Sequence, residues 1–168
     1  RINYETPQFF HVMQYAAAAD REVIDMVSGN PDWEPPAAIR EGLHSYADAD
    51  AAAFQYPPSD GLKPLREEIA ARRNVDSKRV IVTNGTGEAN YLGMAQALEG
   101  DDGGEVVLID PVYPYYPGKV SMLGGETRLV SAAHDGTLDV ETTCAAIGSE
   151  TSLVVLNTPN NPTGAVYD

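Results

Sequence analysis

Two short segments of the chain, residues 106–109 and 153–156, are apolar at every position. A strand with one face in water alternates apolar and polar side chains, whereas a strand of a parallel sheet is covered on both faces and is apolar throughout. The two segments therefore predict buried strands of a parallel sheet. Because parallel strands need long crossover connections, usually helices, the chain is expected to alternate strands with helices.

The sequence around these two segments fits that alternation. Further strands are predicted at residues 79–83, which are rich in β-branched side chains, and at residues 127–130. Helices are predicted at residues 88–98 and 115–123, and from an N-cap at Asp139 to residue 147. The expected fold class is α/β, a three-layer sandwich with a mostly parallel central sheet.

The first half of the chain is less regular. A proline pair, Pro35-Pro36, predicts the start of a helix, because proline is tolerated in the first helical turn. A second helix is predicted after Asp60, with Leu62, Leu65 and Ile69 facing the core.

The charge of the chain limits its partners. Asp and Glu number 25 against 11 Lys and Arg, which gives a formal net charge of −14. Such a surface repels phosphate backbones and anionic lipids, so neither nucleic acid nor a membrane surface is an expected partner. Only Lys63, Lys78 and Lys119 are lysines. An acidic, lysine-poor surface is typical of a protein kept soluble in high salt, and we expect a halophilic source rather than an ordinary acidic one.

Cysteine and hydropathy patterns point to a soluble protein in a reducing compartment. Cys144 is the single cysteine, so no internal disulfide is possible, and no Cys/His cluster has the spacing of a metal site. No apolar run is long enough to cross a bilayer, and the first residues do not resemble a signal peptide. The expected location is the cytoplasm, with no membrane span and no metal.

Ligands of open parallel sheets bind beyond the carboxyl ends of the strands, so the segments after the predicted strands are the candidate site. The segment after residue 83 is Asn84-Gly85-Thr86-Gly87-Glu88, which opens a helix. Glycines that expose backbone N–H groups at a helix start form an anion site suited to phosphate. The alternative is a tight turn in which glycines supply positive φ angles.

Two further segments follow strands and are stiffened by proline. After residue 109, residues 110–117 hold three prolines and three tyrosines, and Tyr113 could offer a flat face to a planar ring. The alternative for this tyrosine is core packing. After residue 156, residues 157–164 contain two X-Pro bonds that fix the direction of the Asn161 amide. A plain turn beside a buried strand does not need this much stiffening.

Together these pieces resemble the pyridoxal-phosphate enzymes of fold type I, specifically the class I and II aminotransferases. The resemblance spans residues 28–168 and is most specific at the Asn-Pro-Thr-Gly motif of residues 161–164. The other matching stretches are Ser28-Gly29-Asn30-Pro31-Asp32, the tyrosine-to-Leu-Arg run of residues 56–66, Val82-Thr83-Asn84-Gly85 and Asp110-Pro111-Val112-Tyr113.

The resemblance implies a role for each matched residue toward pyridoxal 5'-phosphate. Gly85, Thr86 and Gly87 would hold the phosphate of the cofactor. Tyr113 would stack on the pyridine ring, and Asn161 would hydrogen-bond the phenolic oxygen.

Other implied roles involve the substrate and a second subunit. Gly29 would let the substrate carboxylate lie close to the backbone, and Asn161 would also face the substrate. Tyr56 would reach the phosphate bound by a neighbouring subunit, since members of the family share active sites across a homodimer.

The resemblance also implies an activity and a domain division. We expect an aminotransferase that moves an amino group between an amino acid and a 2-oxo acid. Residues 1–50 would form a leader and a helix of the small-domain, substrate-entry region, and residues 51–168 the first part of the cofactor-binding large domain. No catalytic residue is assigned, because the Schiff-base lysine of the family is expected beyond Asp168. The chain by itself is therefore expected to be inactive.

Two alternatives differ in chemistry. A lyase or decarboxylase that uses the same cofactor on the same fold would share all of these residues. A nicotinamide-dinucleotide-binding domain would also place a Gly-x-Gly turn after a strand and an acid, here Asp110, at the end of the next. Asn90 stands where that fingerprint requires a third glycine, and the stiffened segment 157–164 would have no role in it.

Overall fold

A computed structural model describes residues 7–100 and 104–167. These residues form two compact units. One, the sheet unit, combines residues up to Arg21 with those from Gly85 onward, and the other, the helical unit, spans Glu22–Asn84. Within the described ranges, no helix has the length and hydrophobicity needed to cross a membrane.

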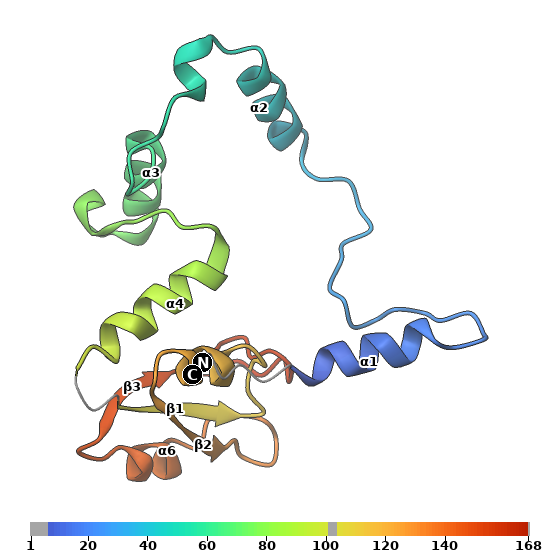
Figure 1. The fold of residues 1–168 in the computed structure, drawn as a ribbon, viewed down its shortest axis with the longest axis vertical. Helices are drawn as coiled ribbons and strands as arrows, with labels where there is room; N and C mark the ends of the chain where they lie inside the picture. The colour runs from blue at the N-terminus through green and yellow to red at the C-terminus, as the bar shows by residue number, and fades with distance from the viewer. Residues whose placement is uncertain (1–6, 101–103, 168) are drawn as a thin grey trace. The chain divides into compact units, whose positions relative to one another are not determined.

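The sheet unit is built on three parallel strands, β1 (Glu105–Asp110), β2 (Glu126–Ser131) and β3 (Thr151–Val155). Their order is β2-β1-β3, so the first strand in the chain is the central one (Figure 1). Leu108 in β1 lies beside Leu129 of β2 and Val155 of β3. The strands predicted at 106–109, 127–130 and 153–156 are therefore confirmed, as is their parallel direction.

Helices cover both faces of this sheet. The side chains of residues 106–109 point alternately to the two faces and are all apolar, so each face needs a covering layer. Val106 and Leu108 pack with Met94 and Val120, which belong to α4 (Gly85–Ala97) and α5 (Tyr116–Met122). Val107 and Ile109 point the other way and pack with Ala146 of α6 (Val140–Ala146). Figure 1 shows α6 beneath the sheet. The α/β fold class with helices on both faces of a parallel sheet is thus confirmed.

The predicted cap of α6 is also present. The Asp139 carboxylate accepts a hydrogen bond from the Thr142 backbone N–H at 2.9 Å and another from the Thr142 hydroxyl at 2.8 Å. These hydrogen bonds hold the pKa of Asp139 below its usual value, because they favour the charged carboxylate. The cap satisfies one of the N–H groups that a helix start leaves without an intrahelical acceptor.

The first helix, α1 (Gln8–Ala17), belongs to the sheet unit, whereas the remaining helices form the helical unit. They are α2 (Ala37–Ala47), η1 (Ala51–Phe54), α3 (Lys63–Arg73) and η2 (Ser77–Arg79). The helix predicted at Pro35-Pro36 is confirmed, with Pro36 as the N-cap of α2. Of the three residues predicted to face a core, Ile69 is partly buried, but the prediction is wrong for Leu62 and Leu65, which are exposed in the described structure.

The strand predicted at residues 79–83 is absent from the described structure. Arg79 ends the short helix η2, and Val80 has extended backbone angles of φ −110° and ψ 125°. The Val82 N–H donates to the Asp60 carbonyl at 3.0 Å instead of to another strand. The β-branched residues thus give an extended conformation, but a strand also needs a neighbouring strand as a hydrogen-bond partner.

A turn before α3 is held close to this extended segment. Gly61 has φ +98°, and a Cβ built on it would lie 2.6 Å from the Val82 Cβ, so only glycine fits there. The Arg66 side chain donates to the Gly61 carbonyl at 3.2 Å and to the Ser77 carbonyl at 3.0 Å, and it lies 3.2 Å from an Asp60 carboxylate oxygen. Arg66 therefore ties α3 to the turn before it and to η2 after it.

Candidate functional site

Two loops at the carboxyl edge of the sheet are joined by one side chain. The loop after β1 begins at Pro111 and carries Tyr113, and the loop after β3 carries Asn161. Asn160 donates from Nδ2 to the Pro111 carbonyl at 3.1 Å. The structure thus brings together two of the three segments that the sequence singled out, at the edge where parallel sheets bind ligands.

Tyr113 lies half-buried in a cluster of tyrosines. Its ring centroid is 5.1 Å from that of Tyr116, with the two planes at 69°, and 5.2 Å from that of Tyr115. It also packs against the core cluster that Val106 and Leu108 form with α4 and α5. The ring therefore packs on the core, as the alternative expected, and its partial exposure leaves the stacking role as a prediction.

Tyr116 anchors the cluster to α4. Its side chain is buried, and burial raises the pKa of its phenol above the usual value, with the neighbouring Tyr113 adding to the rise. A hydrogen bond with the Asn90 side chain acts in the opposite direction on that pKa. Asn90 lies on α4, so the position where a dinucleotide fingerprint would need glycine is occupied by a residue that hydrogen-bonds the first residue of α5.

The predicted phosphate segment forms the first turn of α4. Gly85, Thr86 and Gly87 are all exposed, and Gly85 has φ +74°. Backbone N–H groups in the first turn of a helix have no intrahelical acceptor and can bind an anion. The predicted anion-binding character is therefore compatible with the conformation of this segment.

Asn161 lies in the turn after β3 with its side chain exposed. The preceding Thr158-Pro159 bond and the Asn161-Pro162 bond are both cis, as is Asp110-Pro111 after β1. The neighbouring Asn160 is buried, so the two adjacent asparagines have opposite environments. Sequence reasoning chose the exposed one for ligand contact and overlooked the buried one. The paired asparagines in a stiffened loop mark the segment, but they do not show which of the two is buried.

The remaining predicted residues, Gly29 and Tyr56, belong to the helical unit. Gly29 has φ +63° and follows a turn in which the Asp25 carboxylate accepts from the backbone N–H groups of Val27 and Ser28, at 2.9 and 3.0 Å. A hydrogen bond from the Ser28 side chain is the largest cause that holds the pKa of Asp25 below its usual value, and the two backbone hydrogen bonds add to it. Tyr56 is fully exposed.

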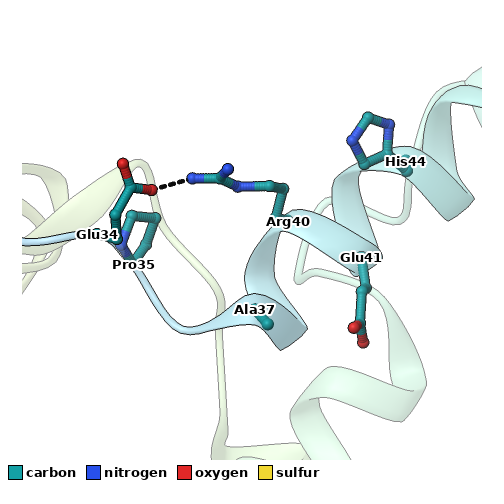
Figure 2. A pocket seen from close by; sticks show the side chains of 6 residues that line it. All are labelled: Glu34, Pro35, Ala37, Arg40, Glu41 and His44. Atoms are coloured by element: carbon teal, nitrogen blue, oxygen red, sulfur yellow. Dashed lines mark hydrogen bonds and ion pairs between the residues drawn. The ribbon is translucent and has the colours of Figure 1, made fainter.

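A shallow hollow of about 340 Å³ lies at the start of α2, and its lining residues come from residues 34–44 alone. In Figure 2, Arg40 reaches back to pair with Glu34, while Glu41 points away from that pair. None of the predicted site residues lines this hollow. It is a local surface feature of α2 and not the predicted ligand site.

Comparison with known proteins finds a family match for this chain. Residues 21–168 match the family described as aminotransferase class I and II. A probable aspartate aminotransferase of Methanocaldococcus jannaschii is 30% identical over 156 residues, which cover 89% of this chain and 40% of that protein. A probable N-succinyldiaminopimelate aminotransferase of Mycobacterium tuberculosis is 36% identical over 154 residues, which cover 85% and 38%.

Solved structures agree with the sequence relatives. The N-succinyldiaminopimelate aminotransferase structure from Mycobacterium tuberculosis matches with a TM-score of 0.83 at 31% identity, over 98% of this chain and 44% of that one. The aspartate aminotransferase of Thermus thermophilus with maleate matches with a TM-score of 0.80 at 31% identity, over 98% and 45%. The chain thus spans about two fifths of its relatives' length, and it belongs to the aminotransferase class I and II family.

Proposed function

We propose that the full-length protein moves an amino group between an amino acid and a 2-oxo acid with pyridoxal 5'-phosphate as its cofactor. Membership of the aminotransferase family supports this assignment. The observation that carries it in the structure is the junction of the loops after β1 and β3 through Asn160 and the Pro111 carbonyl. That junction brings the segments of Tyr113 and Asn161 to one edge of the sheet.

The residues present fit the chemical features of the cofactor, which this family uses. Its phosphate suits the exposed first turn of α4 at Gly85, Thr86 and Gly87, where N–H groups and the helix dipole favour an anion. Its planar ring suits the half-buried Tyr113, and its phenolic oxygen suits the exposed Asn161 amide. When bound, the cofactor supplies an electron sink for carbanion chemistry.

The helical unit is proposed to act on the substrate and on a second subunit. Gly29, which has no Cβ, would let a substrate carboxylate approach the backbone, and the exposed Tyr56 would contact the phosphate in a homodimer. We also propose the domain division at residues 1–50 and 51–168, and a cytoplasmic location. Relatives are named for aspartate, N-succinyldiaminopimelate and methionine, so an amino acid is the proposed class of amino donor.

A half-reaction on the full-length protein tests the proposal. An amino acid without any 2-oxo acid should convert the bound cofactor to its amine form, with loss of its visible absorption band, and a 2-oxo acid should restore that band. If amino acids release ammonia or carbon dioxide instead, a lyase or decarboxylase is the better assignment. If the protein binds a nicotinamide dinucleotide and no pyridoxal 5'-phosphate, both of these assignments are wrong.

Removing the Asn161 amide should weaken cofactor binding. In full-length Asn161→Ala we expect roughly a tenfold loss of affinity for pyridoxal 5'-phosphate, the effect of one hydrogen bond to a charged oxygen. The midpoint pH of the cofactor's absorption change should rise, because the amide favours the ionised phenolic oxygen. Titration of the apoenzyme and a spectral pH titration measure the two effects. Gln96→Ala removes an exposed amide from α4 and is the control; equal behaviour of the two variants would contradict the prediction.

We further propose that the protein comes from a halophilic source, on the basis of its net charge of −14 and its three lysines. Repulsion among surface carboxylates is screened by salt, so molar KCl should raise the melting temperature by several degrees. Potassium chloride is preferred to a sulfate salt, because sulfate stabilises most proteins by exclusion from their surface. A melting temperature that stays constant or falls in KCl would rule out this proposal.

A further inference from the structure

Asn160 is a polar side chain in a buried setting, which calls for an explanation. It is 5% exposed, and among the described residues only Thr143 is a comparably buried polar side chain. Burying an amide is unfavourable unless its donors and acceptor are all used. A residue of this kind is retained where its hydrogen bonds fix a particular arrangement of the chain.

The Asn160 side chain makes hydrogen bonds to three residues in two loops. Its Nδ2 donates to the Pro111 carbonyl at 3.1 Å and to the Thr163 hydroxyl at 3.0 Å. Its Oδ1 accepts from the Asn157 side chain at 3.3 Å. Both amide protons and the amide oxygen therefore have partners, two of them within the loop after β3 and one in the loop after β1.

The backbone of Asn160 closes the turn that contains Asn161. The Asn160 N–H donates to the Ala165 carbonyl at 2.7 Å, and the Asn160 carbonyl accepts from the Gly164 N–H at 2.7 Å. Asn161 lies inside this closed turn and exposes its side chain. The backbone from which the Asn161 side chain projects is therefore tied to the position of Asn160.

The contact with Pro111 extends this control to the other loop. Pro111 follows the last residue of β1, and Tyr113 lies two residues further on. We propose that Asn160 is a positioning residue that holds the loop carrying Asn161 and the loop carrying Tyr113 in a fixed relation at the cofactor site. This inference rests on the proposed function, since it concerns how the same site receives pyridoxal 5'-phosphate.

Asparagine is the side chain that this role requires. An aspartate has the same shape, but an ionised carboxylate cannot donate to the Pro111 carbonyl. Alanine removes all three side-chain hydrogen bonds. If the role of Asn160 is donation to Pro111, Asn160→Asp and Asn160→Ala should lose cofactor affinity to a similar extent although they differ in volume.

The experiment uses the full-length protein and three measurements: apparent affinity of the apoenzyme for pyridoxal 5'-phosphate, the midpoint of the spectral pH titration, and the urea midpoint of unfolding. Asn160→Ala and Asn160→Asp should bind the cofactor roughly tenfold or more weakly, as expected for loss of a buried hydrogen bond. Asn160→Ala should also raise the spectral midpoint in the same direction as Asn161→Ala.

Thr143→Ala is the matched control for a loss of stability alone. Thr143 is 6% exposed, and its hydroxyl donates to the Asp139 carbonyl at 2.6 Å within α6, on the other face of the sheet. This variant should lower the urea midpoint and leave the cofactor affinity and the spectral midpoint unchanged. Should Asn160→Ala fail to accumulate in folded form, Asn157→Ala, which removes only the 3.3 Å contact, is expected to show a smaller effect in the same direction.

A double-mutant cycle identifies the route of the effect. If Asn160 acts in part through Asn161, the affinity loss in Asn160→Ala/Asn161→Ala should be smaller than the product of the two single losses. The role of Asn160 is overturned if wild type and Asn161→Ala behave as expected while Asn160→Ala binds the cofactor like Thr143→Ala. If wild type itself takes up no pyridoxal 5'-phosphate, the proposed function fails, and the inference fails with it.

Discussion

Leu108→Ala is expected to lower the free energy of unfolding by about 2–5 kcal/mol, the range for a leucine deleted from a packed core. Leu108 is completely buried at the centre of β1, where it packs with residues of α4 and α5. Its neighbours come from a sheet and from helices on one side of it, so they cannot all move into the space that the side chain leaves. Part of the expected loss is the cavity itself.

Urea denaturation of the full-length protein, followed by circular dichroism, measures this effect as a shift of the midpoint at constant slope. Thr127→Ala is the control, because Thr127 lies on the neighbouring strand β2 with its side chain exposed. We expect the control to change the free energy of unfolding by less than about 0.5 kcal/mol. Equal losses in the two variants would mean that the residues around β1 do not form the core of the sheet unit.

The central strand was predictable because its own sequence decides its environment. Residues 106–109 are apolar on both faces, and the structure covers them on both faces with helices. Asp139 was predictable for a similar reason, since an N-cap depends on one side chain and on an N–H group three residues ahead. In both cases the signal and the structure it specifies lie within a few residues of each other.

The predictions that proved wrong concern features that depend on a distant part of the chain. Val80 and Val82 favour an extended backbone, but pairing depends on a partner strand, and Val82 instead bonds to Asp60. The apolar face expected for Leu62 and Leu65 likewise depends on what packs against α3, and both side chains are exposed. Local propensity therefore predicted the conformation of these segments but not their environment.

The candidate site shows the same division. The motif around residues 161–164 predicts a ligand contact for Asn161, whereas the proposed role of Asn160 depends on a contact with Pro111, 49 residues earlier in the chain. A pair of adjacent asparagines does not reveal which of them turns inward. Only the packing of the loop after β3 against the loop after β1 distinguishes them.

Arg66→Met is expected to lower the free energy of unfolding by about 1.5–3 kcal/mol, the range for loss of hydrogen bonds from a charged donor, here to two part-buried carbonyls. The Arg66 side chain is 16% exposed and donates to the carbonyls of Gly61 and Ser77. Methionine retains most of the aliphatic volume but leaves those carbonyls without their donor. The ion pair with Asp60 should contribute little, because that carboxylate is 44% exposed to solvent.

Arg72→Met on the same helix is the matched control. Arg72 is 77% exposed and pairs with Glu68 one turn earlier, an arrangement typically worth less than about 0.5 kcal/mol. Urea midpoints of the two variants should therefore differ clearly, and Arg66→Lys should restore only part of the loss, because one ammonium cannot reproduce the planar fork of a guanidinium. If Arg66→Met were no less stable than Arg72→Met, the turn at Gly61 would be held by its own backbone, and the Arg66 hydrogen bonds would contribute nothing to stability.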